Sequence, residues 1–444
     1  MTKIDRAALS VFEAPGADPA HDGSEPASPT AAVPTGAADD DLLAAARALQ
    51  DDVVAIRRRI HRRPEVGLDL PQTQAVILEE LEKLGLEGAV GSALSSVVAV
   101  IEGGRPGPTV LLRADMDALP LHEDTGLDFA SEVGGAMHAC GHDTHVAMLL
   151  GAARLLQERR ADLPGRVILM FQPGEEGLGG AKLMIEEGLL DAAAADRRGE
   201  RASGALAVHI EARYRSGEIH LRPGPEMAAT DTIRITVRGR GGHASAPHTA
   251  LDPIVVAAEI VIALQAMVTR TVDVFDPAVV TIAQITAGTT NNIIPESVFL
   301  VGTIRTVSES TRELVRAGVK RVAEGIAAAH GATAEVDLQP GYPVTINDPA
   351  FTAFVTRAAR DLVGPEKVIE MRAPIMGGED FSYVLQQVPG AMAFVGAQLS
   401  EADPMTAPQN HSNLVVFDEA AMAVGVALYA EVAIRHLNGE SSSR

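Results

Sequence analysis

The sequence predicts an α/β fold: a main domain with a mixed sheet flanked by helices, interrupted by an inserted ferredoxin-like α+β domain. Three observations lead to this prediction. Short apolar runs alternate with helical patterns in the first half of the chain, a β-α-β-β-α-β order occupies its middle, and mixed signals resume towards the C-terminus. Continuous apolar strands separated by helices are typical of layered α/β folds, and the β-α-β-β-α-β order is the ferredoxin-like arrangement.

The first half of the chain supplies most of the main sheet. Residues 1–38 are rich in Ala, Pro, Gly, Asp and Ser, which predicts a disordered tail. From Asp40 to Pro64 apolar residues recur at helical spacing, which predicts a helix that ends at the proline. The apolar runs that predict strands are 95–102, 109–115, 166–172 and 205–210, and 145–159 predicts a helix.

The middle of the chain, residues 229–340, predicts the inserted domain. Its strands are expected at 231–239, 278–287, 297–306 and 333–339, and its helices at 251–270 and 309–330. Residues 39–228 and 341–444 then form the main domain, which ends in a helix near 419–437. The helix 251–270 is apolar enough to bury one face, either against its own sheet or against a second subunit.

Charge and cysteine content exclude several classes of function. The 37 Lys and Arg against 59 Asp and Glu give a net charge of −22, which disfavours nucleic acid and anionic membranes as partners. The single cysteine, Cys140, cannot form an internal disulfide, as is usual in a reducing compartment. No apolar run reaches the roughly 18 residues of a membrane span, and the N-terminus lacks an apolar signal region. We therefore expect a cytoplasmic protein.

Polar side chains follow three of the predicted strands. Asp115 and Asp117 follow the second strand, Glu175 and Glu176 the third, and His209 lies in the fourth. Ligands of open α/β sheets bind outside the carboxyl ends of the strands. One acidic residue after a strand is commonly a turn residue, but three such ends together predict a site.

The stretch MHACGHDTH, residues 137–145, holds the only cysteine and three histidines. In an extended segment Cys140 and His142 would point the same way, and a thiolate with an imidazole suits Zn²⁺ or a similar metal. His145 would lie one turn into the following helix as a supporting or surface residue. The alternative is a cysteine nucleophile with a histidine base, but such a base usually comes from a distant part of the fold. Only a metal site gives the paired glutamates a role, because a carboxylate beside metal-bound water is a good general base.

Eight motifs together resemble a known family: the dinuclear-metal amidohydrolases and aminoacylases, which include hippurate hydrolases, indoleacetyl-amino-acid hydrolases and glutamate-releasing carboxypeptidases. They run in the family's order and cover the chain from about residue 40 to 437. The motifs are RRIHRRPEVG (58–67), RADMDALP (113–120), MHACGHDTHVAMLLGAA (137–153), FQPGEEGLGGAKLMIEEGLL (171–190), GRGGHASAPH (239–248), NIIPESVFLVGTIR (292–305), MGGEDFSYV (376–384) and NHSN (410–413).

The resemblance implies a metal centre in the main domain, which would then be catalytic. Two divalent metal ions per subunit, Zn²⁺, Mn²⁺, Co²⁺ or Ni²⁺, would be bound there, with Cys140 as the bridging ligand. Glu175 matches the general base that moves a proton from the bridging water to the leaving amine, and Asp117 matches a carboxylate that orients a ligand histidine. The five implied metal ligands are Cys140, His142, Glu176, His209 and His411.

The resemblance also assigns residues outside the metal centre. His243, in the insert, matches a histidine that reaches into a neighbouring subunit's site and stabilises the oxyanion, a contact worth roughly 3–4 kcal/mol in comparable sites. Asn292 and Arg305 match residues that bind the substrate near its carboxylate. Gly378 is expected to let the backbone approach the substrate closely. From the sequence alone His243 and Asn292 are turn residues and Arg305 a surface strand residue; the insert is implied to be a lid and to join a homodimer or homotetramer.

One departure from the family pattern narrows the expected activity. Where many relatives carry a ligand histidine two residues before Asp117, this chain has Asp115, as if the Cys-x-His pair replaced it. This favours a small-molecule N-acyl or N-aroyl amino acid substrate, hydrolysed to a carboxylate and a free amino acid. A dipeptidase, an N-acyl-diaminopimelate deacylase and a catalytically inactive metal-binding protein are the alternatives. Glu379 and Asp380, beside the glycine pair, are expected to be solvated.

Overall fold

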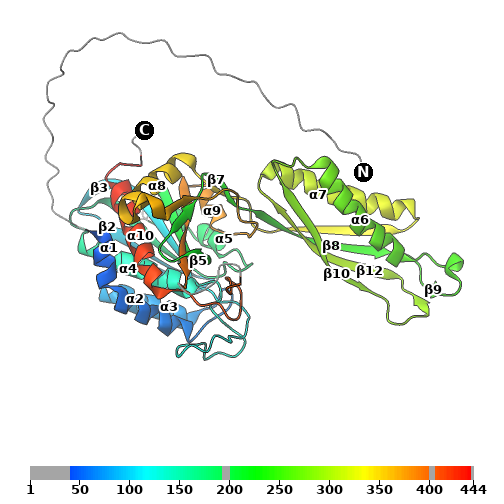
Figure 1. Ribbon diagram of the computed structural model, residues 1–444, viewed down its shortest axis with the longest axis horizontal. Coiled ribbons are helices and arrows are strands. Elements are labelled where there is room, and N and C mark those ends of the chain that lie inside the picture. The colour runs from blue at the N-terminus through cyan, green and yellow to red at the C-terminus, as the bar shows by residue number, and fades with distance from the viewer. Residues whose placement is uncertain (1–40, 193–200, 400–405, 442–444) are drawn as a thin grey trace, which may run out of the picture. The chain divides into compact units, whose positions relative to one another are not determined.

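The computed structural model describes residues 41–192, 201–399 and 406–441. The predicted tail, residues 1–38, lies outside them. The predicted fold class is confirmed, because the chain forms a mixed sheet flanked by helices and a separate four-stranded antiparallel sheet (Figure 1).

The main sheet has eight strands in the order β1-β2-β4-β3-β5-β16-β6-β15. The neighbours β4, β3, β5 and β16 run parallel, and β1, β2 and β6 pair antiparallel with their inner neighbours. Four of these strands are the predicted ones, with ends shifted by a few residues. The bounds are β1 Gly88–Val90, β2 Val97–Glu102, β3 Arg105–Asp115, β4 Pro164–Gln172, β5 Gly204–Arg215, β6 Ile219–Leu221, β15 Val368–Glu370 and β16 Gly390–Gln398.

Helices cover both faces of this sheet because successive strand residues point to opposite sides. Val110 and Leu112 of β3 pack into the larger core, whereas Leu111 packs into the smaller one. The larger core contains α1 Leu42–Ala48, α2 Gln50–His61, α3 Pro71–Lys83, α4 His142–Glu158, α8 Pro349–Val363 and α10 Met422–Leu437. The smaller core contains α5 Gly180–Glu186 and α9 Ser382–Leu385.

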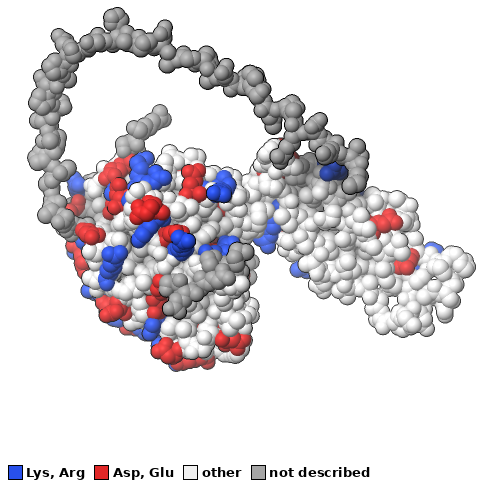
Figure 2. Space-filling view, in the orientation of Figure 1, with Lys and Arg blue, Asp and Glu red and all other residues white. Residues whose placement is uncertain are grey.

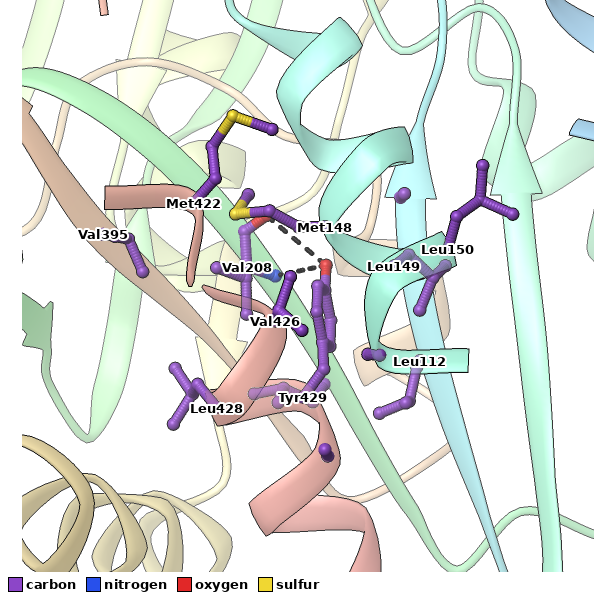
Figure 3. Close-up of a cluster of buried hydrophobic side chains, with 14 of the residues drawn as sticks. Leu112, Met148, Leu149, Leu150, Val208, Val395, Met422, Val426, Leu428 and Tyr429 are labelled. Carbon is purple, nitrogen blue, oxygen red and sulfur yellow. Dashed lines mark hydrogen bonds between the residues drawn. The ribbon is translucent and has the colours of Figure 1, made fainter. Parts of the chain in front are cut away.

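A tyrosine hydroxyl from α10 joins the two central strands where their pairing ends. The β3–β5 register stops at Arg113 and Ala207. Beyond it, the Tyr429 hydroxyl accepts from Val208 N at 3.0 Å and donates to the Arg113 carbonyl at 2.5 Å. Figure 3 shows this ring among the side chains of α4, α10 and the sheet. The hydroxyl therefore stands in for a strand-to-strand hydrogen bond just before the site residues begin.

The separate sheet has the order β10-β12-β8-β13, all antiparallel, with two helices packed on it. This is the predicted ferredoxin-like arrangement. A short antiparallel pair, β9 Gly242–His243 with β11 Ile293–Ile294, extends from it. The bounds are β8 Ala229–Arg238, α6 Pro253–Thr271, β10 Ala278–Ala287, β12 Ser297–Thr306, α7 Glu309–Ala329 and β13 Thr333–Pro340.

The structure differs from the sequence predictions in two helical regions. The expected single helix before Pro64 is two helices, α1 and α2, which meet at Leu49. Two segments, Pro253–Thr271 and Glu419–Leu437, are long and apolar enough for a membrane span by length and composition, although no such run was expected. The second is largely buried in the main core, and the first packs on the insert's sheet. Core helices of soluble proteins commonly have this length and apolar composition, so these two properties alone do not indicate a membrane span.

Candidate metal centre

Parallel pairing brings the predicted strand ends to one edge of the main sheet. β3, β4 and β5 are neighbours and run in the same direction. Asp115 ends β3, Gln172 ends β4, and His209 lies in β5. The carboxyl ends of parallel strands meet at the same edge. Segments far apart in the chain therefore deliver their polar side chains to one place.

The loop after β4 carries the two adjacent glutamates. Asp117, in the loop after β3, accepts hydrogen bonds from Glu175 N and Glu176 N, each at 3.0 Å. Gly174, just before them, has φ of 71°, a left-handed conformation that glycine adopts without strain. Asp117 is also 3.4 Å from His142 Nδ1. This position agrees with the predicted orienting role of Asp117.

Cys140 and His142 are brought together by a turn. The predicted extended segment is wrong, because α4 begins at His142 and Gly141 has φ of 90°. A Cβ on Gly141 would lie 2.3 Å from Ile210 Cγ2, so only glycine fits. The left-handed glycine reverses the chain between the two candidate ligands. Both side chains are buried.

The donor atoms of the five candidate ligands converge. Cys140 Sγ lies 3.5 Å from His209 Nε2 and 3.3 Å from His411 Nε2. Glu176 Oε1 lies 3.2 Å from His411 Nε2 and 4.0 Å from His142 Nε2. Around a tetrahedral zinc ion, with bonds of about 2.0–2.3 Å, neighbouring donors are roughly 3.3–3.8 Å apart. The two Cys140 distances lie in this range and the two Glu176 distances lie just outside it, so the group is compact enough to hold metal ions.

Two buried histidines present ring nitrogens to the other candidate ligands. His142 Nδ1 lies 3.4 Å from Asp117 and His142 Nε2 lies 3.4 Å from Asp115, and neither contact has the alignment of a good hydrogen bond. His209 Nδ1 donates to the Ile210 carbonyl at 2.6 Å, so its Nε2 faces Cys140. Burial lowers the pKa of His209 well below its usual value. The ring is therefore neutral, the form that binds metals.

His411 reaches the cluster from a strained backbone position. Its φ of 70° is the left-handed conformation, which non-glycine residues seldom adopt. Its N–H donates to the Ala139 carbonyl at 2.9 Å, next to Cys140. Such strain persists where surrounding structure enforces it and is common at functional sites. Composition and spacing mark His411 only as a loop histidine, and the family resemblance alone implies that it is a ligand.

Glu175 lies beside the ligands without being one of the central donors. Its side chain is 6% exposed, and its carboxylate lies within 4.8 Å of donor atoms of His142 and Glu176. Burial, together with the negative charges of Glu379 and Glu176, raises the pKa of Glu175 well above its usual value. A carboxylate of raised proton affinity next to a metal centre is suited to proton transfer.

Glu379 and Asp380 are buried, so the prediction that they are solvated is wrong. Both face Arg113, whose guanidinium lies 2.7 Å from Glu379, 3.2 Å from Asp380 and 2.7 Å from Asp115. Gln172 Oε1 accepts from Arg113 Nε at 2.8 Å. A buried charge requires a partner, and one guanidinium here lies against three carboxyl groups. Burial raises the pKa of Glu379 and of Asp380 above their usual values, which favours their neutral forms. The sequence concealed this because the partners lie up to 267 residues apart.

His145 is buried, so it is a supporting residue and not a surface one; both alternatives were open from the sequence. Its Nδ1 lies 2.5 Å from Asp115 Oδ1, and its Nε2 accepts from Ile210 N at 2.8 Å. Asp115 is also 3.4 Å from His142 Nε2. In this chain, position 115 therefore contacts candidate ligand His142 and the supporting histidine.

A cavity of about 540 Å³ opens over these groups. Arg305, in β12, and Gly378 both line it. A Cβ on Gly378 would lie 2.4 Å from Thr230 Cγ2, so packing requires glycine there. His243 and Asn292 are not among the lining residues. They lie in or beside the β9–β11 pair, where Ala244 N donates to the Asn292 carbonyl.

Comparison with known proteins settles the family. The model of Peptidase family M20/M25/M40 matches residues 111–435. The chain belongs to this family. The predicted membership is confirmed, and with it the predicted enzyme class, a metal-dependent amidohydrolase of the M20 family.

Relatives of this M20 chain cover nearly all of its described length. It is 40% identical to thermostable carboxypeptidase 1 of Saccharolobus solfataricus over 88% of this chain and 97% of that one. It is 38% identical to IAA-amino acid hydrolase ILR1-like 4 of Arabidopsis thaliana over 87% of this chain and 86% of that one. The structure of the YXEP protein of Bacillus subtilis, a dinuclear metal binding peptidase, superposes with a TM-score of 0.74 at 34% identity, covering 88% and 99%.

Several residues of the M20 site were not found from the sequence. Residues 173–179, between β4 and α5, are here called the catalytic loop. The side chains of Arg113, Gln172 and Tyr342 contact this loop or its acidic neighbours. Arg113 lies inside an apolar strand, where a charged residue is rare unless it is paired. The sequence therefore gave one indication that Arg113 is paired in the core. The residues around Tyr342, just after the insert, form no pattern that predicts a role for it.

Proposed function

We propose that this M20 enzyme hydrolyses the amide bond of N-acyl or N-aroyl amino acids, releasing a carboxylate and a free amino acid. The observation that carries the proposal is one cavity that holds both Glu175 beside the candidate ligands and the Arg305 guanidinium. It combines a group for proton transfer with a group for a substrate carboxylate. The relative that acts on IAA-amino acids supports this substrate class.

The residues of the site divide the chemistry between them. Cys140, His142, Glu176, His209 and His411 would hold two divalent metal ions, which would polarise the scissile carbonyl and lower the pKa of the attacking water. Glu175 takes a proton from that water and passes it to the leaving nitrogen. Asp117 holds the Glu175 and Glu176 peptides in place through two backbone N–H groups.

Arg305 is assigned to the substrate carboxylate. It is half-buried, and burial lowers the pKa of its guanidinium, which nevertheless stays charged because arginine titrates far above neutrality. In the described part of the chain no carboxylate forms an ion pair with it, so it can bind a ligand anion. Gly378 lines the same cavity and packs closely against Thr230.

His243 and Asn292 are proposed to act in a partner subunit. Neither lines the cavity of its own chain, so a role in catalysis requires a second copy. The insert offers a surface for one: Ile254, Val255 and Ile262 of α6 are exposed. Figure 2 shows few charged side chains over this helix and the neighbouring strands. A homodimer through the insert would cover this apolar face.

The first prediction tests the general base. Glu175→Gln should reduce kcat for an N-acyl amino acid by more than about 10³-fold, because the amide cannot accept the proton. Metal content, measured by elemental analysis of the purified protein, should stay at the wild-type level. Exposed Glu366→Gln is the matched control and should keep full activity. A fully active Glu175→Gln enzyme would contradict the role of Glu175 as the general base.

A second candidate, carboxypeptidase or dipeptidase activity, is favoured by the similarity to thermostable carboxypeptidase 1. A panel of acetyl-, benzoyl- and indoleacetyl-amino acids, dipeptides and N-acyl-diaminopimelate separates the possibilities by kcat/KM. Higher kcat/KM for dipeptides than for every acyl amino acid would overturn the proposed substrate class. Metal without hydrolysis across the panel would indicate a binding protein. Inactivation by thiol alkylation but not by chelators would indicate a cysteine nucleophile.

A further inference from the structure

We propose that Tyr342 is a positioning residue for the general base, holding the Glu175 peptide from the segment that returns from the inserted sheet. The inference rests on the proposed role of Glu175. Tyr342 lies between β13 and β14 Thr345–Asn347, where the chain leaves the insert and re-enters the main domain. It therefore joins the connection between the two sheets to the catalytic loop.

Side chains form hydrogen bonds with both the backbone N–H and the backbone carbonyl of Glu175. Asp117 accepts from its N–H at 3.0 Å, and the Tyr342 hydroxyl donates to its carbonyl at 2.5 Å. The same hydroxyl accepts from Gly179 N at 3.1 Å, four residues further along the loop. One hydroxyl thus spans the loop that carries Glu175 and Glu176.

This loop needs support from outside because its own backbone is permissive. Gly174, Gly177 and Gly179 all have positive φ, and glycine has more accessible conformations than any other residue. A loop so rich in glycine does not restrict the direction of its side chains by itself. Within the loop the Glu175 carbonyl accepts from Gly177 N at 2.7 Å, and Tyr342 adds a side-chain hydrogen bond from outside the loop to the same carbonyl.

Tyr342 is itself fixed to the other connection between the sheets. Thr230, at the start of β8, donates its N–H to the Tyr342 carbonyl at 2.9 Å. Tyr342 N donates to Thr230 Oγ1 at 3.0 Å, and Gly341 N donates to the Thr230 carbonyl at 2.9 Å. The outgoing and returning segments therefore form one hydrogen-bonded unit. A displacement of that unit would be transmitted through the ring to Glu175.

Tyr342 is suited to positioning rather than to proton transfer. Its side chain is almost fully buried, and burial with the nearby negative charge of Asp380 raises the pKa of its hydroxyl far above neutrality. The hydroxyl therefore stays protonated at neutral pH and can donate its hydrogen bond. Its hydrogen bond goes to a backbone carbonyl and leaves the Glu175 carboxylate free.

The test is Tyr342→Phe, which keeps the ring and removes the hydroxyl. We expect kcat to fall on the order of 10- to 100-fold, as a small misplacement of a catalytic group does, with KM within about 3-fold of wild type. Metal content should be unchanged. Tyr383→Phe is the matched control and should keep wild-type kcat, because Tyr383 packs edge-on to Tyr342 at 6.2 Å and has no hydroxyl hydrogen bond among the described residues.

A second variant keeps the proposal testable if Tyr342→Phe folds poorly. Thr230→Val removes only the oxygen that accepts from Tyr342 N, and we expect a smaller fall in kcat in the same direction. Hydrogen exchange at Gly179 N–H should become faster in Tyr342→Phe. Wild-type kcat in both variants would overturn the proposal, as would a fall in kcat matched by loss of metal. If Glu175→Gln is active, the proposed function fails instead, whatever Tyr342→Phe shows.

Discussion

Single residues in this site act mainly by holding other residues. Asp117 holds two backbone N–H groups, and the Arg113 guanidinium contacts three buried carboxyl groups. His142, a candidate ligand, lies with one ring nitrogen beside Asp117 and the other beside Asp115. Side chains that are not candidate ligands therefore fix the position of this ring.

Glu226 is a buried carboxyl group outside the site that should make stability depend on pH. It lies in β7 Gly224–Met227, and its Oε1 has no hydrogen-bond partner among the residues described. Burial raises its pKa from 4.5 to about 8. The folded state therefore binds this proton more tightly than the unfolded state. Its contribution to stability is fully present below about pH 4.5 and is lost as the pH rises to about 8.

Glu226→Gln should remove that dependence, because the amide stays neutral. At pH 7.5 the variant should unfold with a free energy about 2–4 kcal/mol higher than wild type, and at pH 5 the difference should be under about 1 kcal/mol. Urea unfolding at the two pH values measures it. Glu370→Gln, at an exposed position in β15, serves as the control. If wild type and Glu226→Gln differ in stability by the same amount at both pH values, Glu226 is not the source of the pH dependence.

Among the elements, α10 stabilises the sheet directly beneath the site. Its Tyr429 hydroxyl continues the β3–β5 hydrogen-bond ladder by one step (Figure 3). Tyr429→Phe leaves Val208 N and the Arg113 carbonyl unpaired in the core. The free energy of unfolding should fall by about 1–3 kcal/mol.

Chemical denaturation of Tyr429→Phe and of a matched variant measures this loss. Tyr214→Phe is the matched variant, because the described residues offer its hydroxyl no hydrogen bond and its stability should stay within about 0.5 kcal/mol of wild type. KM should be unchanged in both. If Tyr429→Phe is as stable as wild type, the hydrogen bonds of this hydroxyl to Val208 and Arg113 do not stabilise the sheet.

At the scale of the whole molecule, the proposed homodimer makes a direct prediction. Ile262 of α6 is 70% exposed, and Ile262→Glu would place a charge in the proposed interface. Light scattering should then show monomers where wild type forms dimers. If His243 acts across the interface, kcat should fall with the dimer fraction.

Val90→Glu provides the control for the dimer prediction, since Val90 is also exposed but lies in β1 of the main sheet. It should change neither mass nor kcat. A wild-type monomer with full activity would contradict both the interface and the role of His243 in a partner subunit.

The amino-acid sequence by itself determined the alternation of strands and helices in the first half of the chain, the ferredoxin-like insert and the family. Strand ranges such as 278–287 and 297–306 agree with the structure because hydrophobic periodicity is a local property of the chain. The candidate ligands were predicted together only through motifs, since their spacing carries no local signal. Cys140 and His411 are 271 residues apart, yet 3.3 Å separates their donor atoms.

Only the tertiary structure decided which polar residues are buried and what they contact. Glu379 and Asp380 look like solvated acids in sequence, and Tyr342 looks like an ordinary loop residue. Parallel pairing of β3, β4 and β5 brings Arg113, Gln172 and the catalytic loop to one edge of the sheet. The cost of an unpaired buried charge then decides that the acids face the guanidinium. Because burial and partnership depend on segments distant in the chain, no local pattern could have revealed them.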